Sequence, residues 1–93
     1  MQHTSHLVIQ PLISLLATVK QATNPLLRNI SGLIVDDTHN MLTLADGLRH
    51  RQIPKTSTVF ELSLPSGETA KINGTALLGT PAERLRRAKK LRW

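Results

Sequence analysis

Cysteine is absent from this chain of 93 residues, and only Phe60 and Trp93 are aromatic. The absence of cysteine excludes disulfide bonds, thiolate catalysis and cysteine-ligated zinc, and it is typical of proteins in a reducing compartment. We therefore expect a cytoplasmic protein. The scarcity of aromatic residues argues against a surface that stacks nucleic-acid bases, as RRM and OB domains do. Any binding of nucleic acid should depend on backbone charge and shape instead.

A long hydrophobic run is also missing. The most apolar stretch, residues 7–19, is interrupted by Gln10, Pro11 and Ser14, and no Lys or Arg precedes it. It is too short to span a bilayer and lacks the pattern of a signal peptide. With 40% hydrophobic residues, the chain is expected to form one small domain and no more.

Acidic residues are missing from the end of the chain. Six acidic and six basic residues balance up to Glu83, so the net charge of +6 comes from the basic residues that follow it. These are Arg84, Arg86, Arg87, Lys89, Lys90 and Arg92. A block of this kind is either a solvated tail or an arm that binds phosphate, and its charge alone leaves both interpretations open.

The basic block has the signature of a helix. Thr80, Pro81 and Glu83 stand at the N-cap, N1 and N3 positions of a capping box. On a helical spiral, one side is apolar (Ala82, Leu85, Ala88 and Leu91) and the opposite side is basic (Arg86, Arg87 and Lys90). We therefore expect a basic amphipathic helix over 80–93 whose apolar side docks on the rest of the protein. We also expect a short N-terminal helix over 4–10, stopped before Pro11, within a segment 1–14.

Residues 15–79 have the pattern of short strands joined by turns. Apolar stretches at 15–21, 33–35, 41–45, 48–53 and 58–64, and a last one around 70–72, are separated by Gly, Pro, Asp and Asn. Alternation is cleanest in 58–64, where Phe60, Leu62 and Leu64 share one face. Ala70 and Ile72 should face inward as well. Five or six such strands predict a mainly β fold, a small and strongly curved antiparallel barrel.

No group of residues resembles a catalytic centre. Asp36 and Asp37 form the only acidic pair, but neighbouring residues of a strand point to opposite faces and cannot share a metal or a proton. We interpret both as turn-forming residues. His3 and His6 have helical spacing yet lack the further ligands that zinc needs. We expect neither a catalytic residue nor a bound metal.

Arg49 and Arg51 lie two residues apart in a predicted strand, hence on one face, and Lys55 follows shortly after. These cations are either ordinary solvated surface or part of a patch that follows a phosphate backbone, if the patch continues into the basic helix. The sequence leaves both open.

The ordered set of residues across the chain resembles protein component 1 of archaeal ribonuclease P, the counterpart of a eukaryotic ribonuclease P and MRP protein. The likeness covers about residues 12–93. It rests on Thr23-Asn24-Pro25, Ile30, Gly32, Val35-Asp36, Asn40-Met41-Leu42, Ile53-Pro54-Lys55, Phe60, Leu64-Pro65, Gly67, Ile72, Gly74, Leu77, Gly79, Pro81 and Arg84.

The resemblance implies a six-stranded Sm-like barrel with flanking helices. It implies a non-catalytic subunit of the ribonucleoprotein that removes the 5′ leader from precursor tRNA, in which the RNA hydrolyses the phosphodiester with bound Mg²⁺ and this chain binds no cofactor. Its partners would be the ribonuclease P RNA, precursor tRNA, and a zinc-ribbon protein and other protein subunits.

By the resemblance, Lys55 matches a basic residue of a Val/Ile-Pro-Lys element and Arg84 matches the arginine that opens the basic helix. Together with the charge pattern, this gives a set of expected RNA-binding residues: Arg49, Arg51, Lys55, Lys71, Arg84, Arg86, Arg87, Lys89, Lys90 and Arg92. The chain departs from the family at residues 10–14, where the family has His-Glu-Leu-Ile-Gly, and at Thr80, where it often has arginine.

Other functions fit the same residues. A self-assembling Sm-like ring, a small barrel that binds DNA, and a protein-docking module are the alternatives. The apolar residues at 7–9, 12 and 13 favour some contact with another protein.

Overall fold

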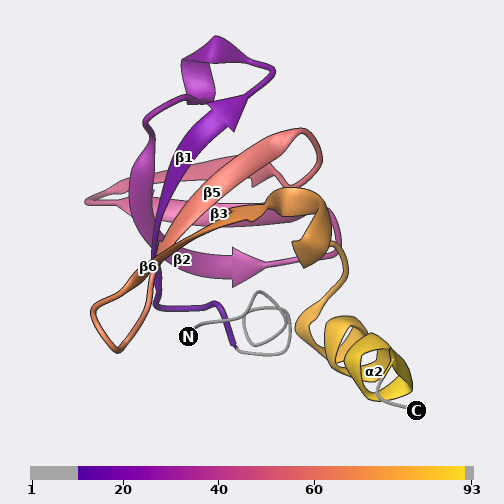
Figure 1. Ribbon diagram of the computed structural model, residues 1–93. Helices are drawn as coiled ribbons and strands as arrows, with labels where there is room; N and C mark the ends of the chain where they lie inside the picture. Colours follow the sequence, from indigo (N-terminus) through magenta and orange to yellow (C-terminus); the bar gives the residue numbers. More distant parts are fainter. Residues whose placement is uncertain (1–10, 92–93) are drawn as a thin grey trace.

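One antiparallel sheet and one C-terminal helix make up the fold in the computed structural model, which describes residues 11–91, with backbone only for 89–91 (Figure 1). The strands are β1 (Leu16–Ala22), β2 (Ser31–Asp37), β3 (Met41–Asp46), β4 (Arg49–Pro54), β5 (Thr58–Ser63) and β6 (Thr69–Asn73). Two 3-10 helices, η1 (Pro25–Leu27) and η2 (Gly74–Leu77), precede the helix α2 (Pro81–Leu91). The N-terminal helix predicted at 4–10 lies outside the described residues, as do His3 and His6.

The six strands follow the order β4-β3-β2-β1-β5-β6, and all neighbours are antiparallel. All six contribute to one hydrophobic core, so the sheet must curl around it (Figure 1). Within residues 11–91, however, no pairing joins the edge strands β4 and β6. The predicted mainly β, antiparallel architecture is confirmed, whereas the closure into a barrel is not.

Alternation along β5 supplies much of the core. Phe60 and Leu62 are fully buried and Leu64, just after the strand, is nearly so, as the sequence pattern predicted. Ile72 on β6 is buried too, and Ala70 is partly buried against the same cluster. Side chains of successive residues in a strand point to opposite faces, so a period of two places one face of β5 inside.

A β-bulge interrupts the alternation of β2. Ile34 pairs with Leu44 and Asp36 pairs with Thr43, so Val35 is an extra residue between the two pairs. The burial follows the bulge, because Ile34 and Asp37 are buried while Val35 and Asp36 are exposed. An extra residue shifts which side chains face inward. Asp37, not Asp36, therefore points into the protein.

The predicted capping box begins α2. The Thr80 amide donates to Glu83 Oε1 at 2.7 Å, and the Glu83 amide donates to Thr80 Oγ1 at 3.2 Å. Both backbone donors would otherwise be unsatisfied at the helix start. No described helix is both long enough and apolar enough to cross a membrane.

The predicted docking of the apolar side of α2 is wrong for the side chains that the structure describes. Ala82 is exposed, Leu85 is 42% exposed and Ala88 is half-buried. Figure 1 shows α2 beyond η2, at one end of the molecule. Polar contacts, described below, hold its first turn instead.

Candidate nucleic-acid interface

Five of the predicted RNA-binding cations reach the surface. Arg49 and Arg51 lie on β4, Lys71 on β6, and Arg86 and Arg87 on α2, and all are exposed. None of the five forms an ion pair within the described part of the chain. The side chains of Lys89, Lys90 and Arg92 lie outside it. The exposed cations are therefore available to an anionic ligand.

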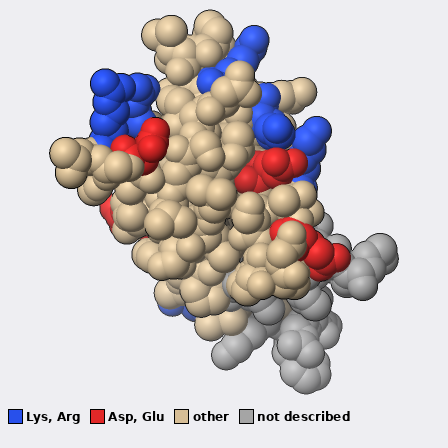
Figure 2. Space-filling view, turned by 90° about the vertical axis from the view of Figure 1, so that its left-hand side faces the viewer, with Lys and Arg blue, Asp and Glu red and all other residues tan. Residues whose placement is uncertain are grey.

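The cations do not merge into one surface on the face that Figure 2 shows. Lys and Arg form separate groups there, divided by uncharged surface and accompanied by acidic residues. On this face the basic side chains therefore form no continuous patch.

Arg49 and Arg51 line an open groove of about 510 Å³ between the start of β2 and the β3–β4 hairpin. Gly32 forms part of its lining, and a Cβ there would lie 2.8 Å from the carbonyl carbon of Ala45. Only glycine allows β2 and β3 to approach this closely. Arg49 and Arg51, which form no ion pair with a described residue, thus line the groove together with Asp46, beside a backbone where a side chain on Gly32 has no room.

Lys55 and Arg84 are not at the surface, and in this respect the expectation from sequence is wrong. Both side chains are 0% exposed. Burial of a charged group is costly unless an opposite charge and hydrogen bonds replace its hydration. Neither cation faces outward to an RNA phosphate in this conformation.

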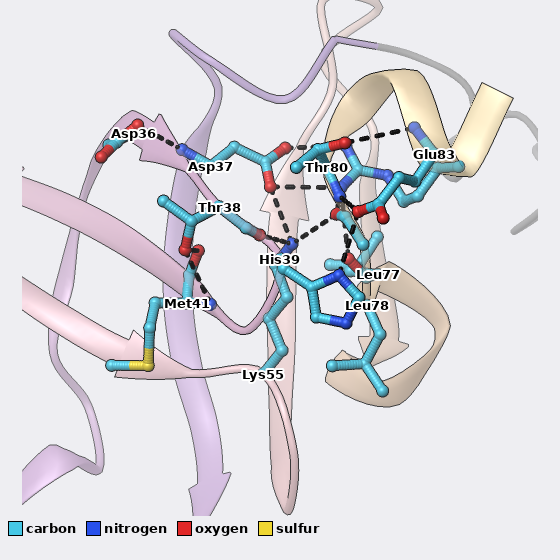
Figure 3. Close-up of polar contacts among 12 residues, drawn as sticks. Asp36, Asp37, Thr38, His39, Met41, Lys55, Leu77, Leu78, Thr80 and Glu83 are labelled. Atoms are coloured by element: carbon cyan, nitrogen blue, oxygen red, sulfur yellow. Dashed lines mark hydrogen bonds and ion pairs between the residues drawn. The ribbon is translucent and has the colours of Figure 1, made fainter.

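Asp37 is the carboxylate on which both buried cations converge, and Figure 3 shows Lys55 pointing towards it. Lys55 Nζ donates to Asp37 Oδ1 at 2.8 Å, and Arg84 binds both oxygens, with Nη1 at 3.1 Å from Oδ1 and Nη2 at 2.7 Å from Oδ2. A two-pronged arginine contact of this kind fixes orientation as well as distance. Asp37 is thus an interior ion-pair partner and not the turn residue that we expected.

Main-chain carbonyls complete the buried ion network of Asp37, Lys55 and Arg84. Lys55 Nζ also donates to the carbonyls of Thr38 at 2.6 Å and Gly79 at 3.0 Å. Arg84 Nη1 donates to the carbonyls of Gly79 at 2.7 Å and Leu77 at 3.2 Å. Burial lowers the pKa of Lys55 from 10.5, and the nearby Arg84 adds to this, although Asp37 acts in the opposite direction.

The network joins three parts of the chain that are distant in sequence. Asp37 ends β2, Lys55 follows β4, and Arg84 lies in the first turn of α2. Two glycines allow the approach: a Cβ on Gly74 would collide with the carbonyl oxygen of Lys55, and Gly79 has a φ of +98°, which side chains disfavour. The network therefore ties the start of α2 to the sheet.

Two further polar contacts hold the same turn. His39 Nδ1 lies 2.9 Å from Glu83 Oε1, and Arg87 Nη2 donates to the Leu78 carbonyl at 2.6 Å. The hydrogen bond from the Thr80 amide, followed by that with His39, lowers the pKa of Glu83 from 4.5 to about 2. Glu83 therefore remains ionised at neutral pH, as a helix N-terminus favours.

The described residues offer binding chemistry and no catalytic arrangement. Both oxygens of Asp37 are occupied by cations, so this carboxylate is not free to act as a base. Among residues 11–88 no three His, Asp or Glu side chains gather as metal ligands. The prediction that the chain binds no metal itself is not tested by this.

Comparison with known proteins gives one consistent result. Residues 5–87 match the family described as ribonuclease P/MRP, subunit p29. The chain belongs to this family. It is 38% identical over 94 residues to ribonuclease P protein component 1 of Methanococcoides burtonii, covering 95% of this chain and 93% of that protein. It is 35% identical over 77 residues to the protein of the same name from Methanothermobacter thermautotrophicus, covering 82% and 83%.

A solved structure agrees with the sequence comparison. It is the structure of Mth11, a homologue of human RNase P protein Rpp29, with 36% identity and a TM-score of 0.61 over 81% of this chain and 97% of that one. The family resemblance seen in the sequence is thereby confirmed, and with it the role of a ribonuclease P subunit involved in tRNA processing.

Within this p29 family member, the sequence contained a signal for the burial of Lys55 that we did not use. Lys55 lies two residues after the buried Ile53, so alternation places it on the inner face. For Arg84 we find no such signal, because its acceptor Asp37 is 47 residues away and faces inward only because of the bulge.

Proposed function

We propose that the chain is a non-catalytic subunit of ribonuclease P that binds the ribonuclease P RNA and supports recognition of precursor tRNA. The observation that carries this proposal is the set of exposed cations, Arg49, Arg51, Lys71, Arg86 and Arg87, none of which is neutralised by a described acidic residue. Unpaired Arg and Lys are the groups that bind RNA phosphates.

In this proposal the curled sheet serves as the Sm-like barrel of the family, and α2 extends the basic surface from its end. Lys89, Lys90 and Arg92 would add to the charge of α2. Phosphate contacts from several sides of the protein would hold neighbouring RNA segments together against their repulsion. The RNA would carry out hydrolysis with its own Mg²⁺, and this chain would hold no cofactor.

The protein partner would be the zinc-ribbon subunit that the family resemblance implies, together with other ribonuclease P proteins. Leu16 and Leu33 pair directly across β1 and β2 and remain 43% and 49% exposed. An exposed apolar pair favours a protein contact in addition to RNA binding. A subunit of an archaeal ribonuclease P would work in the cytoplasm, and this location stays a prediction.

Reconstitution tests the proposal. Ribonuclease P RNA and the other protein subunits are combined with and without this chain, and precursor-tRNA cleavage is measured across Mg²⁺ and salt concentrations. We expect the protein to increase cleavage at low Mg²⁺. Equal cleavage with and without the chain under all conditions would contradict the proposal.

Salt dependence tests the cations. If about four to six phosphates are contacted, the slope of log affinity against log salt should be about −3 to −5. Neutralising Arg86, Arg87, Lys89 and Lys90 to glutamine should weaken binding and flatten the slope. Lys20→Gln is the control, because Lys20 already lies 3.8 Å from Glu61. A homo-oligomeric ring, or equal affinity for duplex DNA, would favour the alternatives instead.

A further inference from the structure

Among the described side chains, the apolar side of helix α2 lacks the buried contact that usually fixes the direction of a surface helix. Leu85, in the middle of its apolar side, is 42% exposed, and Ala82 is exposed as well. Burial of an apolar stripe normally stabilises a helix against the body of a protein. The direction of α2 must therefore depend on other contacts.

The buried ion network supplies such a contact. Arg84 is anchored on both oxygens of Asp37 and on the carbonyls of Leu77 and Gly79, at distances from 2.7 to 3.2 Å. Because Arg84 belongs to the first turn of α2, fixing its guanidinium fixes the start of the helix. Arg86 and Arg87 follow within one turn, so their positions depend on this anchor, and Arg87 is held in addition by the Leu78 carbonyl.

The buried carboxylate of Asp37 cannot contact RNA directly. Its side chain is fully buried and its two oxygens already accept three hydrogen bonds from cations. Its neighbour Asp36 carries the same charge but is exposed and, among the described residues, accepts only from the Asp37 amide. Substitutions at Asp36 and Asp37 therefore distinguish the effect of a negative charge from the effect of anchoring Arg84.

We propose that Asp37 is a positioning residue for RNA binding: by anchoring Arg84, it fixes the direction in which α2 presents its exposed cations. Lys55 supports the carboxylate from the β4–β5 side. This inference rests on the proposed function only in taking α2 as an RNA-binding element. The inference predicts that the affinity for RNA, an anionic ligand, depends on the acidic side chain of Asp37, which does not contact the RNA.

The decisive comparison is Asp37→Asn against Asp36→Asn, with ribonuclease P RNA as the ligand. Each substitution raises the net charge by one, so charge alone would strengthen binding in both. We expect Asp36→Asn to bind as well as the wild type or better. Asp37→Asn should bind on the order of 10-fold more weakly at 0.15 M salt, with a flatter salt slope, since one or two phosphate contacts are lost.

A second experiment measures the position of α2 relative to β4 in the absence of RNA. The chain has no cysteine, so Gln52→Cys on β4 and Leu85→Cys on α2 allow two spin labels to be attached at exposed sites. We expect a narrow distance distribution in the wild type and in Asp36→Asn, and a broad one in Asp37→Asn. Circular dichroism confirms that the sheet remains folded.

The outcomes separate this inference from the proposed function. If Asp37→Asn keeps both the narrow distribution and full RNA affinity, the inference is wrong. If the distribution broadens but neither Asp37→Asn nor Arg86→Gln changes affinity, α2 does not bind RNA and the positioning proposal fails with it, while reconstitution can still support a ribonuclease P role. Should Asp37→Asn not fold, Arg84→Lys replaces it: it keeps the charge, loses the two-pronged contact and should give the same weakening.

Discussion

Replacing Lys55 by methionine should cost less stability than replacing Asp37 by asparagine, although both substitutions remove one partner of the same buried contact. In Lys55→Met, both oxygens of Asp37 keep their bonds to Arg84, and the Gly79 carbonyl keeps Arg84 Nη1. Asp37 Oδ1 and the Gly79 carbonyl each lose one bond from Lys55 but keep one from Arg84, whereas the Thr38 carbonyl loses its bond from Lys55 with no donor from Arg84 to replace it. In Asp37→Asn, two buried cations lose their shared carboxylate.

These differences set the magnitudes. A buried carbonyl that loses its donor costs about 1–3 kcal/mol, offset in part because an ammonium no longer has to be buried. We expect a net loss of about 1–2 kcal/mol for Lys55→Met. Removing the only carboxylate beside buried cations costs about 3–5 kcal/mol. The two variants should therefore differ by about 2 kcal/mol or more.

Urea unfolding followed by circular dichroism measures the difference. With a denaturant slope of about 1 kcal/mol per molar for a small domain, the two midpoints should differ by about 2 M. The sequence contains no cysteine, so no disulfide exchange complicates the transition. Equal midpoints, or a lower midpoint for Lys55→Met, would refute the assignment of Asp37 as the centre of the network.

The stability difference between the wild type and Lys55→Met should also depend on pH. Burial lowers the pKa of Lys55 below 10.5, so between the lowered value and 10.5 the unfolded chain holds a proton that the folded chain has released. Stability rises with pH where the unfolded state binds more protons. The wild type should therefore gain stability relative to Lys55→Met as the pH rises through this window. A constant difference would contradict the lowered pKa.

Three other outcomes are expected. Gly74→Ala should lose about 1–3 kcal/mol of unfolding free energy in urea, because its Cβ would meet the carbonyl of Lys55. Gly47→Asn is the control: position 47 lies in open space at a φ of +62°, so this substitution should leave the stability nearly unchanged. The pKa of Glu83 is lowered from 4.5 to about 2, so the stabilisation that its carboxylate gives to the cap is complete above pH 4.5 and is lost as the pH falls towards 2. Amide exchange at Thr80 should show this loss in the wild type but not in Glu83→Gln. Phe60→Ala should lose about 3–5 kcal/mol, since its ring is fully buried, whereas an unchanged midpoint would place the core elsewhere.

Local patterns in the sequence predicted most of the fold. The alternation of Phe60, Leu62 and Leu64 fixed one inner face, and the capping box at Thr80 and Glu83 fixed the start of α2. Both depend on residues at most four positions apart. Strand alternation and helix capping depend on residues this close in sequence, so both can be predicted without knowing the tertiary structure.

The site was harder to predict because its contacts are distant in sequence. Lys55 and Arg84 look like surface cations until Asp37 is known to meet them, 18 and 47 residues away. The apolar spacing of Ala82 and Leu85 showed which side of α2 is apolar, but spacing does not show whether anything covers it. Family resemblance matched Lys55 and Arg84 to family positions, but their burial beside Asp37 was not part of the expectation.

The bulge in β2 has a consequence for deletions. Two residues, Val35 and Asp36, separate the inward-facing Ile34 and Asp37 where regular alternation needs one. Deleting Val35 would therefore restore regular pleating and still leave Asp37 facing inward, with Asp36 taking the outward position. This strand should therefore tolerate the loss of the residue at position 35 without turning the carboxylate away from Lys55 and Arg84.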